Sequence, residues 1–296
     1  MDLQILAQLS AVGLMMGALY SLMAIGITFI ASVMKLINWS MGEFYMIGSY
    51  VQYYLIILVL GPERWYLALP VAMFTVFLLG LVLQRGLLAP MFKYDEARRF
   101  EYATIITIAL SVLLQNLAII LAGPYQWSPR EYLPTATFAG LSLNGSRLAG
   151  AIGAAVILAL FYGFIKHTMV GLSFLGAAQN RLGAQTAGIQ LARVDMIAFG
   201  IGVGLAAAAG ALLAPVFLVY PTNGVISTVK GFEIIVIGGL GSLPGAVAAA
   251  FGLALVESFG AFYISPAYQD LYGFAFLIAF LILRPQGLFG ERERRV

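Results

Sequence analysis

Most of this chain consists of long stretches that contain no charged residue. They are Leu3–Met34, Phe44–Pro62, Trp65–Gln84, Tyr102–Pro129, Leu148–Ile165, Met196–Val229 and Ile234–Val256. A helix needs about 20 mainly apolar residues to cross a bilayer. Only helices or closed barrels can cross, because lipid offers backbone polar groups no partner. The stretches lack the alternation of barrel strands. The sequence therefore predicts an all-α polytopic membrane protein, and the 10% share of charged residues, against roughly 25% in soluble domains, agrees.

We expect eight full spans. They lie near residues 8–30, 44–60, 66–84, 103–122, 148–166, 196–219, 245–263 and 267–284. The basic residues of the connectors predict their orientation, since Lys and Arg near span ends favour the cytoplasm. Three basic clusters occur, at 85–99, at 166–193 and at the C-terminus, where Arg284, Arg292, Arg294 and Arg295 stand. These regions are predicted to be cytoplasmic and the N-terminus to be outside.

Eight crossings that start outside also end outside, which conflicts with a cytoplasmic C-terminus. Another segment, near Phe232–Leu240, must therefore enter the membrane. Its nine residues cover only about 14 Å of helix. We expect a broken or re-entrant segment here, and eight to nine transmembrane helices in all.

Two spans carry small residues every four positions, at Gly13 and Gly17 in the first and at Gly200 and Gly204 in the sixth. Such spacing lets helix backbones approach closely in lipid. Met1–Gln4 lacks Lys and Arg, and the apolar run that follows is too long for a signal peptide. The chain has no cysteine, which excludes disulfides.

Two segments interrupt the apolar pattern with Gly and polar residues: LINWSMGEF at 36–44 and GGLGSLPG at 238–245. Non-helical backbone at membrane depth persists only when it is buried in protein or lines a watery cavity. A pair of such breaks indicates a transport pathway, and we expect the two to face each other across a central path. Glu43, Glu233 and Glu257 lie at or near these breaks. Each of the three glutamates fits either a pathway or gate role or a structural role as a cap or an interhelical hydrogen bond.

The connector at 171–194 reads GLSFLGAAQNRLGAQTAGIQLARV and mixes amide and basic residues with small and aliphatic ones. Leu175, Ala178 and Leu182 are spaced to lie on one side of a short helix. We interpret this stretch as an amphipathic element outside the bilayer that is available to a partner protein. An ordinary solvated loop helix fits the same pattern.

Motifs of soluble chemistry are missing from the sequence. It has no phosphate-binding Gly-rich loop with Lys and Ser/Thr, no metal-spaced His cluster and no nucleophile elbow. We therefore expect no enzyme activity, catalytic residue, metal, cofactor or nucleic-acid partner. If ATP drives the protein, another chain hydrolyses it.

Four motifs lie in order along nearly the whole chain. LINWSMGEFYMIGSY at 36–50 is similar to INxxHGExxMxGAY, and VKGFEIIVIGGLGSLPGA at 229–246 is similar to LKAFxAxVLGGxGSxxGA. The 171–194 stretch is similar to GxxxRAxAxDxxxAxxxGIxxxxV, and RPQGLFG at 284–290 to RPxGLFG. These signatures belong to the permeases of branched-chain amino-acid ABC transporters, the Liv type, and the chain most resembles the shorter permease of the pair.

The resemblance implies an ABC-importer permease fold in a single transmembrane domain over residues 1–296, with an ATPase-coupling segment at 169–195. The implied pathway or gate residues are Asn38, Met41, Gly42, Glu43, Gly238, Gly239, Gly241, Ser242 and Glu257. The implied coupling residues are Gly171, Ala178, Gln179, Asn180, Arg181, Gly188 and Ile189.

The implied partners are a second homologous permease in a hetero- or homodimer, two cytoplasmic ABC ATPases and a periplasmic substrate-binding protein. The implied location is the bacterial inner membrane, and the implied function is import of branched-chain amino acids by alternating access.

The chain departs from the signatures at informative positions. Met41 replaces the signature His, while Leu175 and Leu182 replace a coupling Arg and Glu. These changes indicate an altered gate or cargo and a matched ATPase groove. Urea, short amides and polar amino acids are alternative cargoes. An ion-coupled secondary transporter also uses broken helices but needs no coupling helix, and a channel is disfavoured because no polar pore ring recurs.

Overall fold

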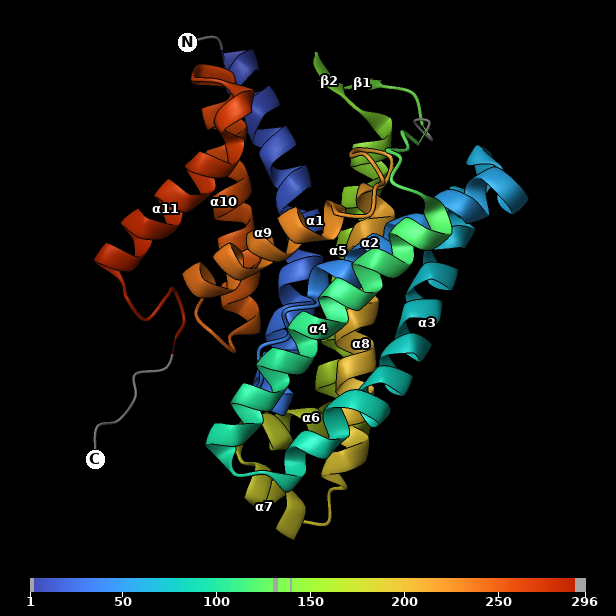
Figure 1. Cartoon of the computed structure of the whole chain (residues 1–296). Coiled ribbons are helices and arrows are strands. Elements are labelled where there is room, and N and C mark those ends of the chain that lie inside the picture. Colours follow the sequence, from blue (N-terminus) through green and yellow to red (C-terminus); the bar gives the residue numbers. More distant parts are fainter. Residues whose placement is uncertain (1–2, 130–132, 139, 291–296) are drawn as a thin grey trace.

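The computed structural model describes residues 3–129, 133–138 and 140–290 (Figure 1). Arg292, Arg294 and Arg295, which contribute to the predicted charge pattern, lie outside this range. The α-helices are α1 (Leu3–Met34), α2 (Met41–Leu55), α3 (Trp65–Leu83), α4 (Glu96–Ala122), α5 (Gly145–His167), α6 (Met169–Gln179), α7 (Arg181–Thr186), α8 (Leu191–Leu213), α9 (Asn223–Gly238), α10 (Leu243–Tyr263) and α11 (Gln269–Leu283). Shorter turns are η1 (Ile56–Leu60), η2 (Pro62–Arg64), η3 (Gln84–Leu88), η4 (Ala89–Lys93) and η5 (Pro266–Tyr268), and two strands are β1 (Ala136–Phe138) and β2 (Leu141–Leu143).

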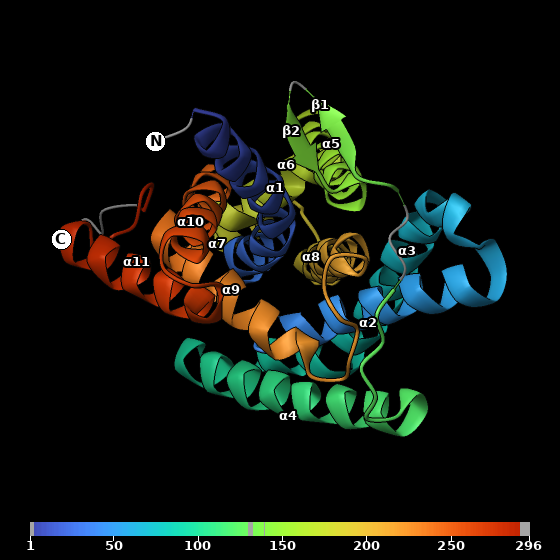
Figure 2. The same ribbon diagram turned by 90° about the horizontal axis from the view of Figure 1, so that it is seen from above.

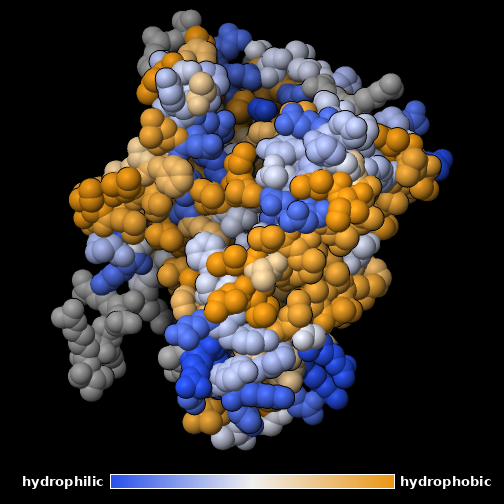
Figure 3. Space-filling view, viewed as in Figure 1, coloured by the Kyte–Doolittle hydropathy of each residue, from blue (hydrophilic) through white to orange (hydrophobic). Residues whose placement is uncertain are grey.

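Eight helical segments within the described residues are long and apolar enough to span a membrane, in agreement with the eight expected spans. On the face shown in Figure 3, apolar residues form a broad band across the middle of the molecule, and hydrophilic residues gather at the end that holds α6 and α7. The predicted polytopic helical fold is therefore confirmed. The hairpin β1–β2 was not expected; Gln4 and Gln8 of α1 donate hydrogen bonds to its carbonyls.

The segment near 232–240, which we expected to enter the membrane, belongs to α9, and its predicted extent is wrong. The helix begins at Asn223 and has 16 residues. It covers about 24 Å, less than the roughly 30 Å hydrocarbon core. It lies mainly across the bundle, from beside α2 to beside α10, with a shallow slope toward the α6–α7 end (Figure 1). The segment after α11 comes near the end of α6, since Gln286 and Gln179 line the same cavity.

Helix α8 is the centre of the bundle, with α1, α2 and α3 packed around it (Figure 2). Small residues permit these approaches, as predicted. A Cβ on Gly202 would lie 2.9 Å from the carbonyl oxygen of Gly26 on α1, and a Cβ on Gly48 of α2 would overlap the Ala207 backbone. Gly13 of α1 packs in the same way against Leu255 of α10. Close backbone contact replaces the hydrophobic drive that lipid does not supply.

Helices α4 and α11 lie at the periphery (Figure 2). Large apolar side chains of both helices are exposed, including Ile105 and Ile120 on α4 and Leu271 and Ile282 on α11. In a chain that spans a membrane, such surfaces face lipid or another membrane subunit.

Candidate functional site

The predicted coupling stretch forms two helices, α6 and α7, instead of one amphipathic helix. The joint is Asn180, whose extended backbone ends α6 and whose side-chain oxygen accepts a hydrogen bond from the Gly183 amide at 2.9 Å. Thr168 caps the start of α6 in the same manner, through the Gly171 amide. Both are N-caps that satisfy a free helix N–H. Leu175 and Leu182, expected on one face, therefore belong to different helices.

Arg181 fastens this helix pair to the rest of the bundle. Its guanidinium donates two hydrogen bonds to Asp195 at the start of α8, at 2.9 and 2.7 Å, and a third to the carbonyl oxygen of Val33 at the end of α1, at 2.7 Å. It also lies over the ring of Phe92 in η4, with 4.9 Å from its central carbon to the ring centroid. A guanidinium suits such bidentate and stacked contacts. One side chain therefore joins α7 to three other elements.

The predicted coupling residues divide into two groups. Gly171, Arg181 and Ile189 face the protein, because Gly171 is buried against the last turn of α5 and Ile189 packs on the core. Gln179, Asn180 and Gly188 are exposed, and Ala178 lies between the groups. Large apolar side chains are exposed next to them, namely Met169, Leu172, Leu175 and Leu182. Of the predicted coupling residues, the second group is therefore free to contact a partner, together with these apolar residues.

The first break, residues 35–40, runs beside α9. Gly42, at the start of α2, meets Gly224 at the start of α9 so closely that a Cβ on either would overlap the other backbone. Trp39 stacks at a tilt on Phe232 in the middle of α9, with 4.9 Å between ring centroids. The side-chain oxygen of Asn38 accepts hydrogen bonds from the amide and hydroxyl of Ser40, which fixes the turn. Met41 is fully buried.

Glu43 is buried and accepts a hydrogen bond from the Ser111 hydroxyl of α4 at 2.9 Å. Its second carboxyl oxygen has no partner within the described residues. Ser111 thus links the peripheral helix α4 to the start of α2.

The second break, residues 239–242, follows α9. Gly239 and Gly241 have φ values of +95° and +88°, a left-handed conformation that favours glycine. The Gly241 carbonyl accepts a hydrogen bond from Ser32 of α1 at 2.9 Å, and Ser242 caps α10. Gly238 lies against Gly245 with no room for a Cβ on either.

A cavity beside this break is lined by Lys35, Gln179, Gly241, Ser242 and Gln286 among others. Lys35 is the first residue of the first break, so one end of that break meets the second break at this cavity, while Trp39 lies along α9. The expectation that the two breaks face each other across a transport path stays a prediction.

Glu257 of α10 is at the centre of a buried charge cluster, at the end of the bundle opposite α6 and α7. It pairs with Lys230 of α9 and accepts hydrogen bonds from the Tyr20 hydroxyl at 3.1 Å and the Gln269 amide at 2.9 Å. Lys230 also pairs with Asp270 of α11 at 2.9 Å. The cluster joins α1, α9, α10 and α11. In the described part of the chain, no group of three or more His, Cys, Asp or Glu is arranged to hold a metal.

Sequence reasoning selected Glu257 but missed Lys230, Asp270 and Tyr20. The available signal was Lys230 itself, a single cation between two long apolar runs. An ionisable residue at membrane depth requires a partner. A Lys230–Glu257 pair could therefore have been predicted, because Glu257 follows the next apolar run.

The fold and this site define a membrane transport permease, and the sequence comparison specifies which kind. The chain belongs to the family described as "Branched-chain amino acid transport system / permease component", whose model matches residues 10–281.

Its relatives include the high-affinity branched-chain amino acid transport system permease proteins LivH of Escherichia coli K12 and BraD of Pseudomonas aeruginosa. They are 28% and 29% identical to it, and each alignment covers 95% of this chain and 94% of the relative. A probable branched-chain amino acid transport permease protein LivH of Methanocaldococcus jannaschii is 26% identical over 91% of the chain and 88% of its own length. No solved structure matches.

Proposed function

We propose that this chain is the permease subunit of an ATP-driven importer of branched-chain amino acids that works by alternating access. The carrying observation is the α6–α7 pair held by Arg181 against the ends of α1 and α8. A push on this pair acts on the central helix α8 and on α1 together. The near-complete coverage of relatives named for branched-chain amino acid transport supports the cargo.

The partners follow from the same surfaces. The exposed side chains Met169, Leu172, Leu175 and Leu182 offer an apolar contact to one of two separate ATPase subunits, which hydrolyse the ATP. The exposed faces of the peripheral helices are available to a second, homologous permease. A substrate-binding protein delivers cargo at the opposite end of the bundle.

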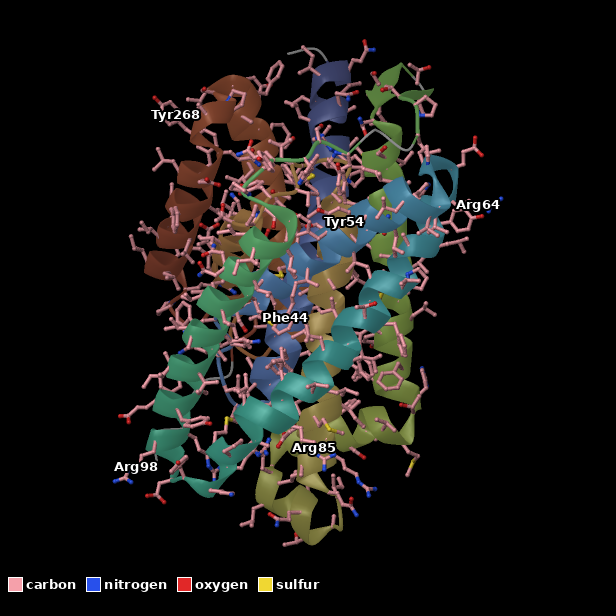
Figure 4. The ribbon with its side chains drawn as sticks, turned by 45° about the vertical axis from the view of Figure 1, so that its right-hand side comes forward. Phe44, Tyr54, Arg64, Arg85, Arg98 and Tyr268 are labelled. Carbon is pink, nitrogen blue, oxygen red and sulfur yellow. The ribbon has the colours of Figure 1, made fainter. Side chains whose placement is uncertain are left out.

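The orientation proposed is N-terminus outside and C-terminus in the cytoplasm of a cell whose plasma (inner) membrane holds the protein. Arg85 and Arg98 lie at the α6–α7 end, and Tyr268 lies at the other (Figure 4). Arg64 also lies toward the far end (Figure 4). The greater number of basic residues at the α6–α7 end supports a cytoplasmic position for it.

Leu182→Glu tests the coupling role, because the Leu182 side chain is 73% exposed. We expect co-purification of the ATPases and leucine uptake to fall, with insertion of the permease unchanged. Leu3→Glu makes the same change at an exposed residue of the opposite end and serves as the control. An intact complex with normal uptake in Leu182→Glu would contradict the assignment.

A further inference from the structure

A cavity of about 370 Å³ opens between α1, α9 and the start of α11, within the size range of small-ligand sites. Its wall contains apolar side chains, among them Leu19, Met23, Phe217, Ile226 and Ile234. It also contains polar side chains, among them Tyr20, Tyr45, Asn223, Lys230 and Asp270. A cavity with both kinds of lining suits a ligand that has an aliphatic portion and a charged portion.

The two carboxylates that hold Lys230 differ in their surroundings. Glu257 is 2% exposed and accepts further hydrogen bonds from Tyr20 and Gln269. The side chain of Asp270 is 65% exposed and, among the described residues, is bonded to Lys230 alone. Glu257 is therefore a fixed partner of the ammonium, while Asp270 is an exchangeable one.

We propose that this cavity binds the zwitterion of an aliphatic α-amino acid by exchange at Lys230, an inference that rests on the proposed function. The carboxylate of the ligand takes the place of Asp270 on the Lys230 ammonium. The freed Asp270 then pairs with the ammonium of the ligand, and the aliphatic side chain lies against Met23, Ile226 and Ile234. The Lys230–Asp270 pair is replaced by one pair at each end of the zwitterion. Both charges of the ligand therefore have a partner, which is the condition for charges away from water.

The surrounding charges select against other ligand classes. Glu233 lies next to the cluster, since a Cβ on Gly273 of α11 would lie 2.7 Å from its carboxyl oxygen and 3.4 Å from that of Glu257. Arg147 and Glu257 together line a separate, adjacent cavity. Three carboxylates thus lie around the single ammonium of Lys230, which disfavours a ligand with net negative charge. An amine without a carboxylate can pair with Asp270 but brings no group to replace Asp270 on Lys230, which then keeps Glu257 alone.

The test is uptake of radiolabelled L-leucine by cells that express the complete transport system. Asp270→Asn keeps the shape and the Lys230–Glu257 pair but removes the exchangeable charge. We expect uptake to fall about tenfold, equal to ~1.4 kcal/mol, with unchanged permease level and unchanged ATPase activity stimulated by the binding protein. Asp270→Glu is expected to recover most of the uptake. Glu63→Gln, which neutralises an exposed carboxylate in η2, is the matched control.

A second variant tests whether the apolar lining of the cavity contacts the ligand, and it changes no charge. Ile226→Trp fills part of the cavity, so leucine uptake is expected to fall at least fivefold more than alanine uptake. Wild-type uptake in Asp270→Asn, or an unchanged leucine-to-alanine ratio in Ile226→Trp, would overturn the site while leaving the proposed function in place. Failure of the wild-type system to take up leucine would overturn the proposed function as well.

Discussion

Two cations, the half-buried Arg181 and the buried Lys230, lie near opposite ends of the bundle and are held in different ways. Arg181 grips one carboxylate with both arms of its guanidinium and adds a backbone carbonyl and an aromatic ring. Lys230 is shared between two carboxylates, one buried and one largely exposed. A rigid planar donor fixes several elements in one geometry, whereas an ammonium is a point charge that exchanges partners readily. The first arrangement suits the transmission of force and the second suits binding and release.

Removing the carboxylate at the rigid joint should have the largest effect on stability. Asp195→Ala leaves the Arg181 guanidinium without its bidentate partner, and breaking a buried pair in this way costs about 3 kcal/mol. Thermal unfolding of the detergent-solubilised protein should show a clear loss of stability, and ATPase coupling should fall with it. Ala192→Ser, a small change on the first turn of α8 and three residues before Asp195, is the control. If Asp195→Ala were as stable as wild type, Arg181 would not be the fastening that the geometry indicates.

Arg181→Lys should have a smaller effect on stability, because it retains the positive charge but loses the forked guanidinium. The lysine ammonium cannot make the two parallel hydrogen bonds, the Val33 contact and the ring contact together. We therefore expect the free energy of unfolding to fall by about 1–2 kcal/mol. Uptake should fall while ATPase co-purification is partly retained. If Arg181→Lys were as stable and as active in uptake as wild type, the difference between a rigid joint at Arg181 and an exchangeable one at Lys230 would not hold.

Glu43→Gln should have the smallest effect on stability, since Glu43 is bonded to a neutral hydroxyl within the described residues and not to a cation. Gln retains an oxygen that can accept from Ser111, so we expect a change below about 1 kcal/mol and normal assembly. Leucine uptake is nevertheless expected to change if the start of α2 borders the transport path. Unchanged uptake would exclude Glu43 from that path.

The spans were predictable because each apolar run is long enough to determine its structure without tertiary information. The start of α9 was not, because Lys230 and Glu233 give its middle the composition of a connector. Only in three dimensions does Lys230 meet Glu257 and Asp270 from other helices. The break at Asn180 was missed for a related reason: a helical period continues through a residue that the fold uses as a cap.

The function was less accessible from physical patterns than the fold. Periodicity left the 171–194 stretch open between a docking element and a solvated loop. The motif resemblance identified the permease family, and the family match confirms it. The inward orientation of Arg181, by contrast, depends on Asp195, Val33 and Phe92 converging, and no motif predicts that convergence.

The contact between the segment after α11 and the end of α9 constrains the order in which the protein can mature. The carbonyls of Ile237 and Gly238 accept hydrogen bonds from the amides of Leu288 and Phe289, at 2.8 and 3.1 Å. These amides are synthesised some fifty residues after α9. When α9 leaves the ribosome, its last two carbonyls therefore have no partner yet. Such groups are costly in lipid, so the newly made helix has to stay hydrated or sheltered by the insertion machinery until translation reaches position 289.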